Sequence, residues 1–172
     1  MLRRLGVLRE IEKYAIVPNS IAMHRYSDGA ILSEQNLLPH CGTLYGSPYL
    51  LVRRADLHYV LVSAAKLLGV NIRLKSTVRG VDFAKPGLIL DKEEVVEGDV
   101  VIAADGLRSQ CREAFLGKKD PPVPSGTLVY RATLNPAKLM QHEDLESLVD
   151  YPEFHCWIGT KEPPNIMVYF DN

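Results

Sequence analysis

The chain has 172 residues, of which 47% are hydrophobic and 24% are charged, and its formal net charge at pH 7 is -1. This composition supports a core of ordinary size and argues against a wholly disordered chain. The near balance of acidic and basic residues argues against sequence-independent binding to nucleic acid or to an acidic membrane surface.

The sequence predicts neither a secretion signal nor a membrane span. Charged residues interrupt the apolar stretch behind Arg3 and Arg4, and no run approaches the ~18 apolar residues that a membrane helix needs. Cys41, Cys111 and Cys156 are odd in number and far apart, which argues against a disulfide framework or a zinc site. We therefore expect a reduced, cytoplasmic protein with no metal and with neither nucleic acid nor membrane as a partner.

The first third of the chain combines a helix, a hairpin and a loop. Residues 21–25 and 30–33 flank Ser27-Asp-Gly, which is a hairpin signal. Residues 36–48 contain two prolines and two glycines and are expected to form a loop. Apolar residues at helical spacing predict an amphipathic helix before the hairpin; they are Leu2, Leu5, Leu8, Ile11 and Ala15.

A second helix is predicted from Asp56 to Leu68, because Asp56 suits a helix start and Gly69 suits a helix end. Short strands are then predicted at 71–74, 78–83 and 88–90. We expect the apolar face of the helix to pack in a core; it comprises Leu57, Leu61, Ala64, Ala65 and Leu68.

The strongest strand prediction is 99–104, a short apolar run that stops at Asp105-Gly106. Gly106 permits a tight turn, and Asp105 would lie at the carboxyl end of the strand, where open α/β sheets bind ligands. A helix is predicted from Leu107 to Leu116.

The proline-rich stretch 120–126 cannot continue that helix and reads as a connector between domains. Beyond it, short helices are expected between 136 and 149. Strands are expected at 127–134, near 154–158 and at 166–170.

The pattern Ala104-Asp-Gly-x-x-Ser-x-x-Arg112 resembles the second flavin-site motif of the FAD-dependent aromatic hydroxylases, the family of salicylate hydroxylase and para-hydroxybenzoate hydroxylase. Further segments are similar to this family and follow its order along the chain: 6–15, 25–29, 49–59, 70–75, 77–82, 130–134 and 157–159. The family's Gly-x-Gly-x-x-Gly turn and its later Gly-Asp motif do not occur in the sequence. We therefore expect the central part of such a flavoprotein, cut at both ends.

The resemblance implies an α/β fold in two parts. Residues 1–120 would form an incomplete FAD-binding domain, Rossmann-like and of the glutathione-reductase type. Residues 121–172 would begin a strand-rich substrate domain.

The resemblance also implies roles for individual residues. Arg54, Val78, Asp105 and Gly106 match cofactor-binding positions, and an arginine suits a phosphate because its guanidinium donates paired, charge-assisted hydrogen bonds. Arg53 is the alternative to Arg54, although neighbouring side chains of a strand point to opposite faces. The competing interpretation is core packing for Val78 and a plain structural turn for Asp105.

Arg131 and Tyr169 match positions that line the family's substrate pocket, so the resemblance implies that they bind the substrate. The resemblance further implies that the protein acts as an FAD-dependent monooxygenase, which hydroxylates a small aromatic compound with O2 and with NADH or NADPH. Two alternatives stay open: an inactive fragment and a non-redox nucleotide-binding or interaction module. Self-association through an exposed sheet edge is a further expectation.

Overall fold

The computed structural model describes residues 1–91, 94–126, 136–141, 153–159 and 166–168. The chain divides into two compact units. Residues 1–70 and 132–172 form the first unit, and residues 71–131 form the second.

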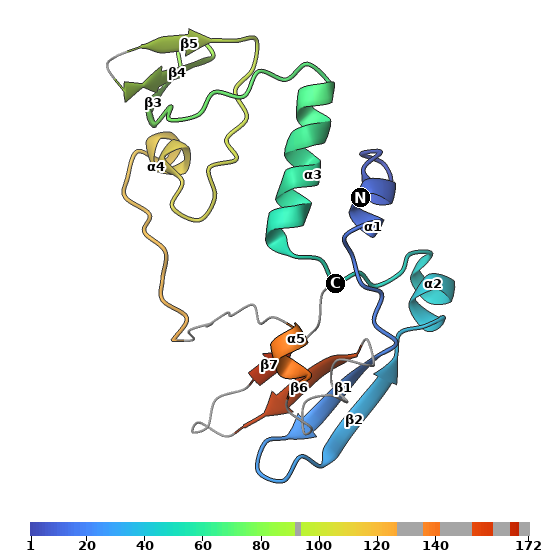
Figure 1. Ribbon diagram of the computed structural model, residues 1–172. Coiled ribbons are helices and arrows are strands. Elements are labelled where there is room, and N and C mark those ends of the chain that lie inside the picture. The colour runs from blue at the N-terminus through green and yellow to red at the C-terminus, as the bar shows by residue number, and fades with distance from the viewer. Residues whose placement is uncertain (92–93, 127–135, 142–152, 160–165, 169–172) are drawn as a thin grey trace. The chain divides into compact units, whose positions relative to one another are not determined.

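The first unit contains a four-stranded sheet with the strand order β2-β1-β6-β7. Its strands are β1 (Ser20–Arg25), β2 (Ile31–Asn36), β6 (Phe154–Ile158) and β7 (Ile166–Val168). As Figure 1 shows, β1 and β2 form a hairpin, and β1 also pairs in parallel with β6, although more than a hundred residues separate them in the chain. The predicted hairpin is confirmed, and so are the strands predicted near 154–158 and from residue 166.

Side chains fix the β1–β2 turn. Asp28 accepts a hydrogen bond from the Ala30 N–H at 3.1 Å and forms an ion pair with Arg25 at 2.6 Å. Gly29 has a φ of 72°, a conformation that glycine adopts without a steric penalty. Because these contacts are local, the turn signal in the sequence is sufficient to predict them.

Four helices are described in the first unit: α1 (Leu8–Glu12), α2 (His40–Tyr45), α3 (Arg54–Leu67) and α5 (Pro136–Leu139). The core contains Val7, Ile11 and Val60, and it joins α1 to α3. The second predicted helix is confirmed as α3. The first is shorter than predicted, because Gly6 has a φ of 72° and the helix begins only at Leu8.

Two further expectations about these helices are wrong. The predicted loop 36–48 contains α2, whose single buried residue, Cys41, is too little to produce a helical periodicity in the sequence. The predicted apolar face of α3 packs only in part. Leu57 and Ala64 lie against the core, whereas Leu68 follows the end of the helix and is 83% exposed.

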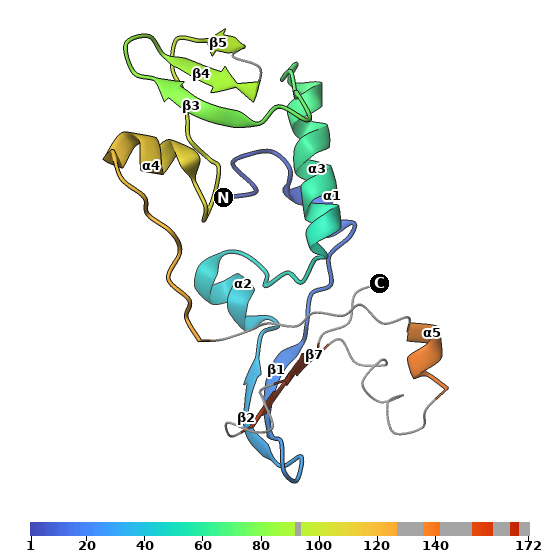
Figure 2. The same cartoon turned by 90° about the vertical axis from the view of Figure 1, so that its left-hand side faces the viewer.

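The second unit contains the antiparallel sheet β3-β4-β5, formed by β3 (Val78–Asp82), β4 (Gly87–Leu90) and β5 (Val95–Glu97). Helix α4 (Gln110–Leu116) lies beside β3 (Figure 2). The strands predicted near 78–83 and 88–90 are confirmed. Residues 71–74 are not a strand, and β5 was not predicted because three residues carry too little pattern.

The strongest strand prediction is wrong in this structure. Residues 99–104 form no strand, and Val100 and Ile102 are 73% and 82% exposed. An apolar run becomes a buried strand only beside a neighbour that accepts and donates its backbone hydrogen bonds, and no described strand pairs with this run.

The observed architecture is a mixed α/β arrangement with two small sheets. The Rossmann-like detail and the domain boundary after residue 120 remain predictions, while the four-stranded sheet draws strands from both sides of that boundary. Within the described residues, no helix has the length and apolar character required to cross a membrane.

Candidate functional site

The turn before α4 is held by the carboxylate of Asp105. One carboxylate oxygen accepts a hydrogen bond from the Ser109 hydroxyl at 2.6 Å, and the other accepts one from the Cys111 N–H at 3.1 Å. The Ser109 hydroxyl oxygen in turn accepts from the Arg112 N–H at 2.9 Å, which makes Ser109 the N-cap of α4. The predicted helix start at Leu107 is therefore wrong, because α4 begins at Gln110, directly after its N-cap.

These contacts keep Asp105 ionised. The hydroxyl of Ser109, followed by the backbone N–H of Cys111, lowers the pKa of Asp105 from 3.8 to about 2. A carboxyl group with a lowered pKa stabilises the folded state above its ordinary pKa and loses that contribution as the pH falls toward the lowered value. The anchor at the turn thus persists down to strongly acidic pH.

Arg112 connects the segment before α4 with the segment after it. Its guanidinium donates to the Asp120 carboxylate at 2.8 Å, to the Leu107 carbonyl at 3.0 Å and to the Asp120 carbonyl at 3.1 Å. Glu113 accepts a hydrogen bond from the Asp120 N–H at 3.1 Å, and Lys119 lowers the pKa of Glu113 by a hydrogen bond to its carboxylate. The chain entering α4 and the chain leaving it are therefore tied together through one arginine.

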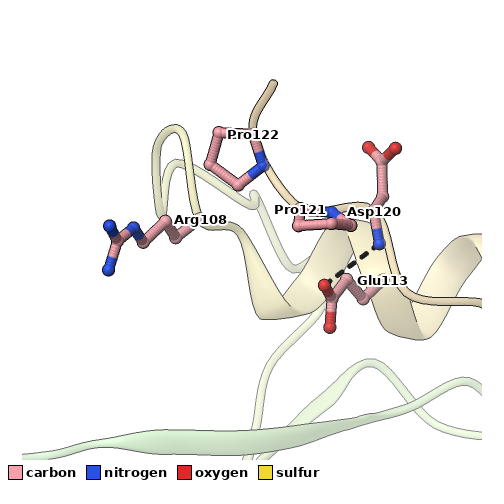
Figure 3. A pocket seen from close by; sticks show the side chains of 5 residues that line it. All are labelled: Arg108, Glu113, Asp120, Pro121 and Pro122. Carbon is pink, nitrogen blue, oxygen red and sulfur yellow. Dashed lines mark hydrogen bonds between the residues drawn. The ribbon is translucent and has the colours of Figure 1, made fainter. Parts of the chain in front are cut away.

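Beside this network lies an open pocket of about 410 Å³, lined by Arg108, Glu113, Asp120, Pro121 and Pro122 (Figure 3). The Arg108 side chain points away from Glu113 and Asp120 in this view. The two prolines prevent the chain from continuing as a helix at this point, because neither can donate a backbone hydrogen bond.

A larger groove of about 570 Å³ runs between β3, residues 101–106 and α4. Phe83 and Phe115 lie in it with ring centroids 6.5 Å apart. Gly106 lines the groove with a φ of 76°, and a Cβ at this position would meet no atom within 4 Å. The groove is lined by Val81, Asp82, Phe83, Pro86, Val101, Ala103, Asp105, Gly106, Ser109, Cys111, Arg112 and Phe115.

The Cys111 thiol in this groove is not activated. Burial, and then the negative charge of Asp105, raise the pKa of Cys111, so the thiol stays protonated at neutral pH. Within the described residues, no group of three His, Cys, Asp or Glu side chains is arranged to hold a metal ion.

Within the second unit, the structure brings together two of the six predicted site residues, Asp105 and Gly106. Val78 begins β3, where it is half-buried and pairs with Leu90, and it does not line the groove. Arg131 and Tyr169 lie outside the described residues.

Arg54 belongs to the other unit, where it is exposed as the first residue of α3. The alternative, Arg53, is the N-cap residue and forms an ion pair with Asp56 at 2.7 Å. This ion pair leaves Arg54 as the better candidate for binding an anion.

Sequence reasoning did not assign roles to Asp120 and Glu113. The cap at Ser109 was also missed, because the helix was predicted to begin at Leu107, and nothing in the Ser-x-x-Arg spacing indicates which acidic residue Arg112 will bind.

No protein-family model matches the chain. The FAD-dependent monooxygenase OpS4 of Beauveria bassiana is 34% identical over 162 residues, which cover 92% of this chain and 38% of that protein. The 6-hydroxynicotinate 3-monooxygenase of Bordetella bronchiseptica is 31% identical over 172 residues, and the match covers 99% of this chain and 42% of that protein.

The fold is similar to that of the tetrameric form of 2-methyl-3-hydroxypyridine-5-carboxylic acid oxygenase. The TM-score is 0.69 at 21% identity, and the match covers 99% of this chain and 42% of that one. The chain thus spans about two fifths of the length of these two monooxygenases.

The cap of α4 can be tested by Ser109→Ala. We expect the free energy of unfolding to fall by about 1 kcal/mol, the typical cost of losing a serine N-cap, and the pKa of Asp105 to move up toward its ordinary range. Urea unfolding and an NMR titration of the carboxyl groups measure the two effects. Ser76→Ala is the control, because its hydroxyl bonds only to Leu74 O outside any helix, and it should cost less than about 0.5 kcal/mol. Equal losses in the two variants would show that Ser109 does not cap the helix.

The backbone of the turn can be tested by Gly106→Ala. Its φ of 76° should cost an L-residue about 1 kcal/mol of stability, even though the added methyl group has open space. Gly42→Ala is the matched control, because Gly42 also has open space but lies inside α2 without a positive φ. There alanine should stabilise the helix by up to about 1 kcal/mol. Urea midpoints moving in the same direction for both variants would contradict this account.

Proposed function

Because the homologues of this chain are FAD-dependent monooxygenases, we propose that it forms part of an enzyme that hydroxylates a small aromatic compound with FAD, O2 and NADH or NADPH. The observation that carries the proposal is the Asp105-Gly106 turn. Its carboxylate binds the start of α4 through both oxygens, and its glycine lines the groove with open space where a side chain would be. FAD, when bound, supplies the redox chemistry that activates O2. The chain's own residues bind and orient it.

In this proposal Gly106 allows close approach of the cofactor, since a side chain at that position would occupy the open space. Asp105 acts through the turn, because both of its carboxylate oxygens already accept hydrogen bonds from the start of α4. A rigid, pre-ordered turn reduces the entropy that would otherwise be lost when a ligand orders it.

Arg54 is proposed to donate to the cofactor's phosphates or flavin edge. Its exposure at the N-terminus of α3 supports this role, because the helix dipole there also favours a negative ligand. Val78 is proposed to contact the adenine through its backbone. Arg131 and Tyr169 are proposed to bind an oxygen substituent of the substrate by charge and by hydrogen bonding, respectively.

We further propose that residues 1–120 belong to the cofactor-binding part and 121–172 to the substrate-binding part, with the hairpin β1–β2 contributing to the sheet of the latter. The exposed apolar side chains of Val100 and Ile102 support self-association of the isolated chain.

FAD binding is tested by titrating the cofactor into the purified chain and following the quenching of flavin fluorescence. We expect saturable binding that Arg54→Ala weakens by about tenfold, corresponding to the loss of one charge-assisted hydrogen bond. Arg9→Ala, which removes an exposed positive charge from α1, should leave the dissociation constant unchanged. A folded chain that does not bind FAD, or an Arg54 variant that binds like the Arg9 variant, would contradict the proposed role.

Self-association is tested by sedimentation velocity over a range of concentrations. Ile102→Lys should shift the chain toward the monomer, because it places a charge in the exposed apolar run. Val123→Lys is the control, since Val123 is 89% exposed in the connector and outside that run. A chain that remains monomeric at every concentration would disprove the association.

A further inference from the structure

Two histidines far apart in the chain meet in the middle of the four-stranded sheet. His24 lies on β1 and His155 lies on β6, 131 residues later, and His24 Nε2 is 3.0 Å from His155 Nδ1. The His24 ring also stacks on Trp157, with centroids 4.9 Å apart and an interplanar angle of 17°. The pair therefore joins the two strands by a side-chain hydrogen bond in addition to the backbone ladder.

The partners of the two rings fix where the protons lie. His24 Nδ1 is 3.3 Å from the Gly29 carbonyl, and a carbonyl oxygen can only accept, so this nitrogen carries the hydrogen. In the neutral pair, His24 Nε2 then accepts from His155 Nδ1. The remaining nitrogen, His155 Nε2, lies 3.6 Å from the Glu153 carboxylate and has no hydrogen to offer it.

This arrangement can hold one added proton with its hydrogen bond intact, but it cannot hold two. A proton on His155 Nε2 converts the contact with Glu153 into an ion pair and leaves the hydrogen bond to His24 intact. A second proton on His24 Nε2 removes the only acceptor of that hydrogen bond. Two N–H groups and two positive charges would then face each other across 3.0 Å, which forces the rings apart.

Two acidic residues lie on the segments around the pair, Glu153 before β6 and Glu34 on β2. Burial lowers the pKa of His155, which is 7% exposed; Glu153 opposes this effect and His24 reinforces it. Glu34 on β2 lies across Ala22 from His155 in the same row of the sheet, but it is exposed. The positions opposite His155 and Trp157 on β7 are Val168 and Ile166, which do not titrate. The ion pair of Arg25 and Asp28 lies at the hairpin turn.

We propose that His24 and His155 form a pH-responsive latch, which holds β1 to β6 while the pair carries at most one added proton and opens when both imidazoles are charged. Opening would divide the described sheet at its only parallel pairing, because β2 is joined to it through β1 and β7 through β6. The products are two hairpins, β1–β2 and β6–β7.

The direction of the pH effect follows from linkage. The folded-state pKa of His155 lies below the unfolded value of about 6.5, so the unfolded chain binds more protons as the pH falls through this range. The stability contributed by the pair is therefore complete above the unfolded pKa and declines as the pH is lowered toward the folded one. For each such proton, the unfolding equilibrium constant rises by up to about tenfold per pH unit.

Trp157 is the chain's only tryptophan and stacks directly on His24, so its fluorescence reports on the latch. A protonated imidazole quenches indole emission on contact, and separation of the rings changes it again. We expect the emission of the full chain to change in a sigmoidal manner between pH 8 and pH 5, and the urea midpoint to fall over the same range. His24→Gln should remove the change in emission and reduce the fall of the urea midpoint, because its amide oxygen can still accept from His155 Nδ1 but cannot be protonated, while the burial of His155 remains.

His58→Gln is the matched control, since His58 is an exposed histidine of α3 in the same unit, and it should titrate like the original chain. His155→Gln should also abolish the transition, and if that variant does not fold, the comparison of the original chain with His24→Gln still decides. A Trp157 emission and a urea midpoint that both stay constant from pH 8 to pH 5 would overturn the proposal. It would equally be overturned by a His24→Gln chain that titrates like the original.

Discussion

Backbone N–H and C=O groups must find partners, and this requirement governs which parts of the chain become regular. Where two strands are close in sequence, as in β1–β2 and β3–β4–β5, the ladder forms from local hairpins. Where the apolar run 99–104 has no described neighbour, it stays irregular and exposed. At its end, side chains take over, because the Asp105 carboxylate and the Ser109 hydroxyl accept the first N–H groups of α4.

The same requirement explains what could be predicted from the sequence. The hairpin of residues 20–36 was predictable because its turn depends on Asp28 and Gly29, which act within a few residues. The helix α3 was predictable because it is long enough to show both a periodicity and an end at Gly69. The prediction of a strand at 99–104 failed, because an apolar run records a preference for burial and not the presence of a partner. Parallel pairing of β1 with β6 leaves no local signal at all.

The candidate site also combines local contacts, which the sequence can indicate, with contacts to distant residues, which it cannot. Asp105, Ser109 and Arg112 lie within eight residues, and the turn at Asp105-Gly106 was predictable, whereas the cap at Ser109 was missed because the helix was predicted to begin at Leu107. The contact of Arg112 with Asp120 depends on where the chain goes after Gly117, so spacing did not predict it. Arg54 and Val78 were matched to a cofactor through the resemblance alone, and their roles rest on contacts to a ligand rather than to each other.

The two polar clusters of the chain respond to acid at different pH. The hydrogen bonds to Asp105 keep its pKa at about 2, so the turn before α4 retains its charged anchor throughout the range in which histidines titrate. The His24–His155 pair lies in the other unit, where burial lowers the pKa of His155 from its ordinary value of about 6.5 and the neighbouring His24 reinforces that effect. Mild acid therefore acts on the four-stranded sheet while leaving the Asp105 turn charged. A loss of cofactor binding at pH 5 could then not be attributed to protonation of Asp105.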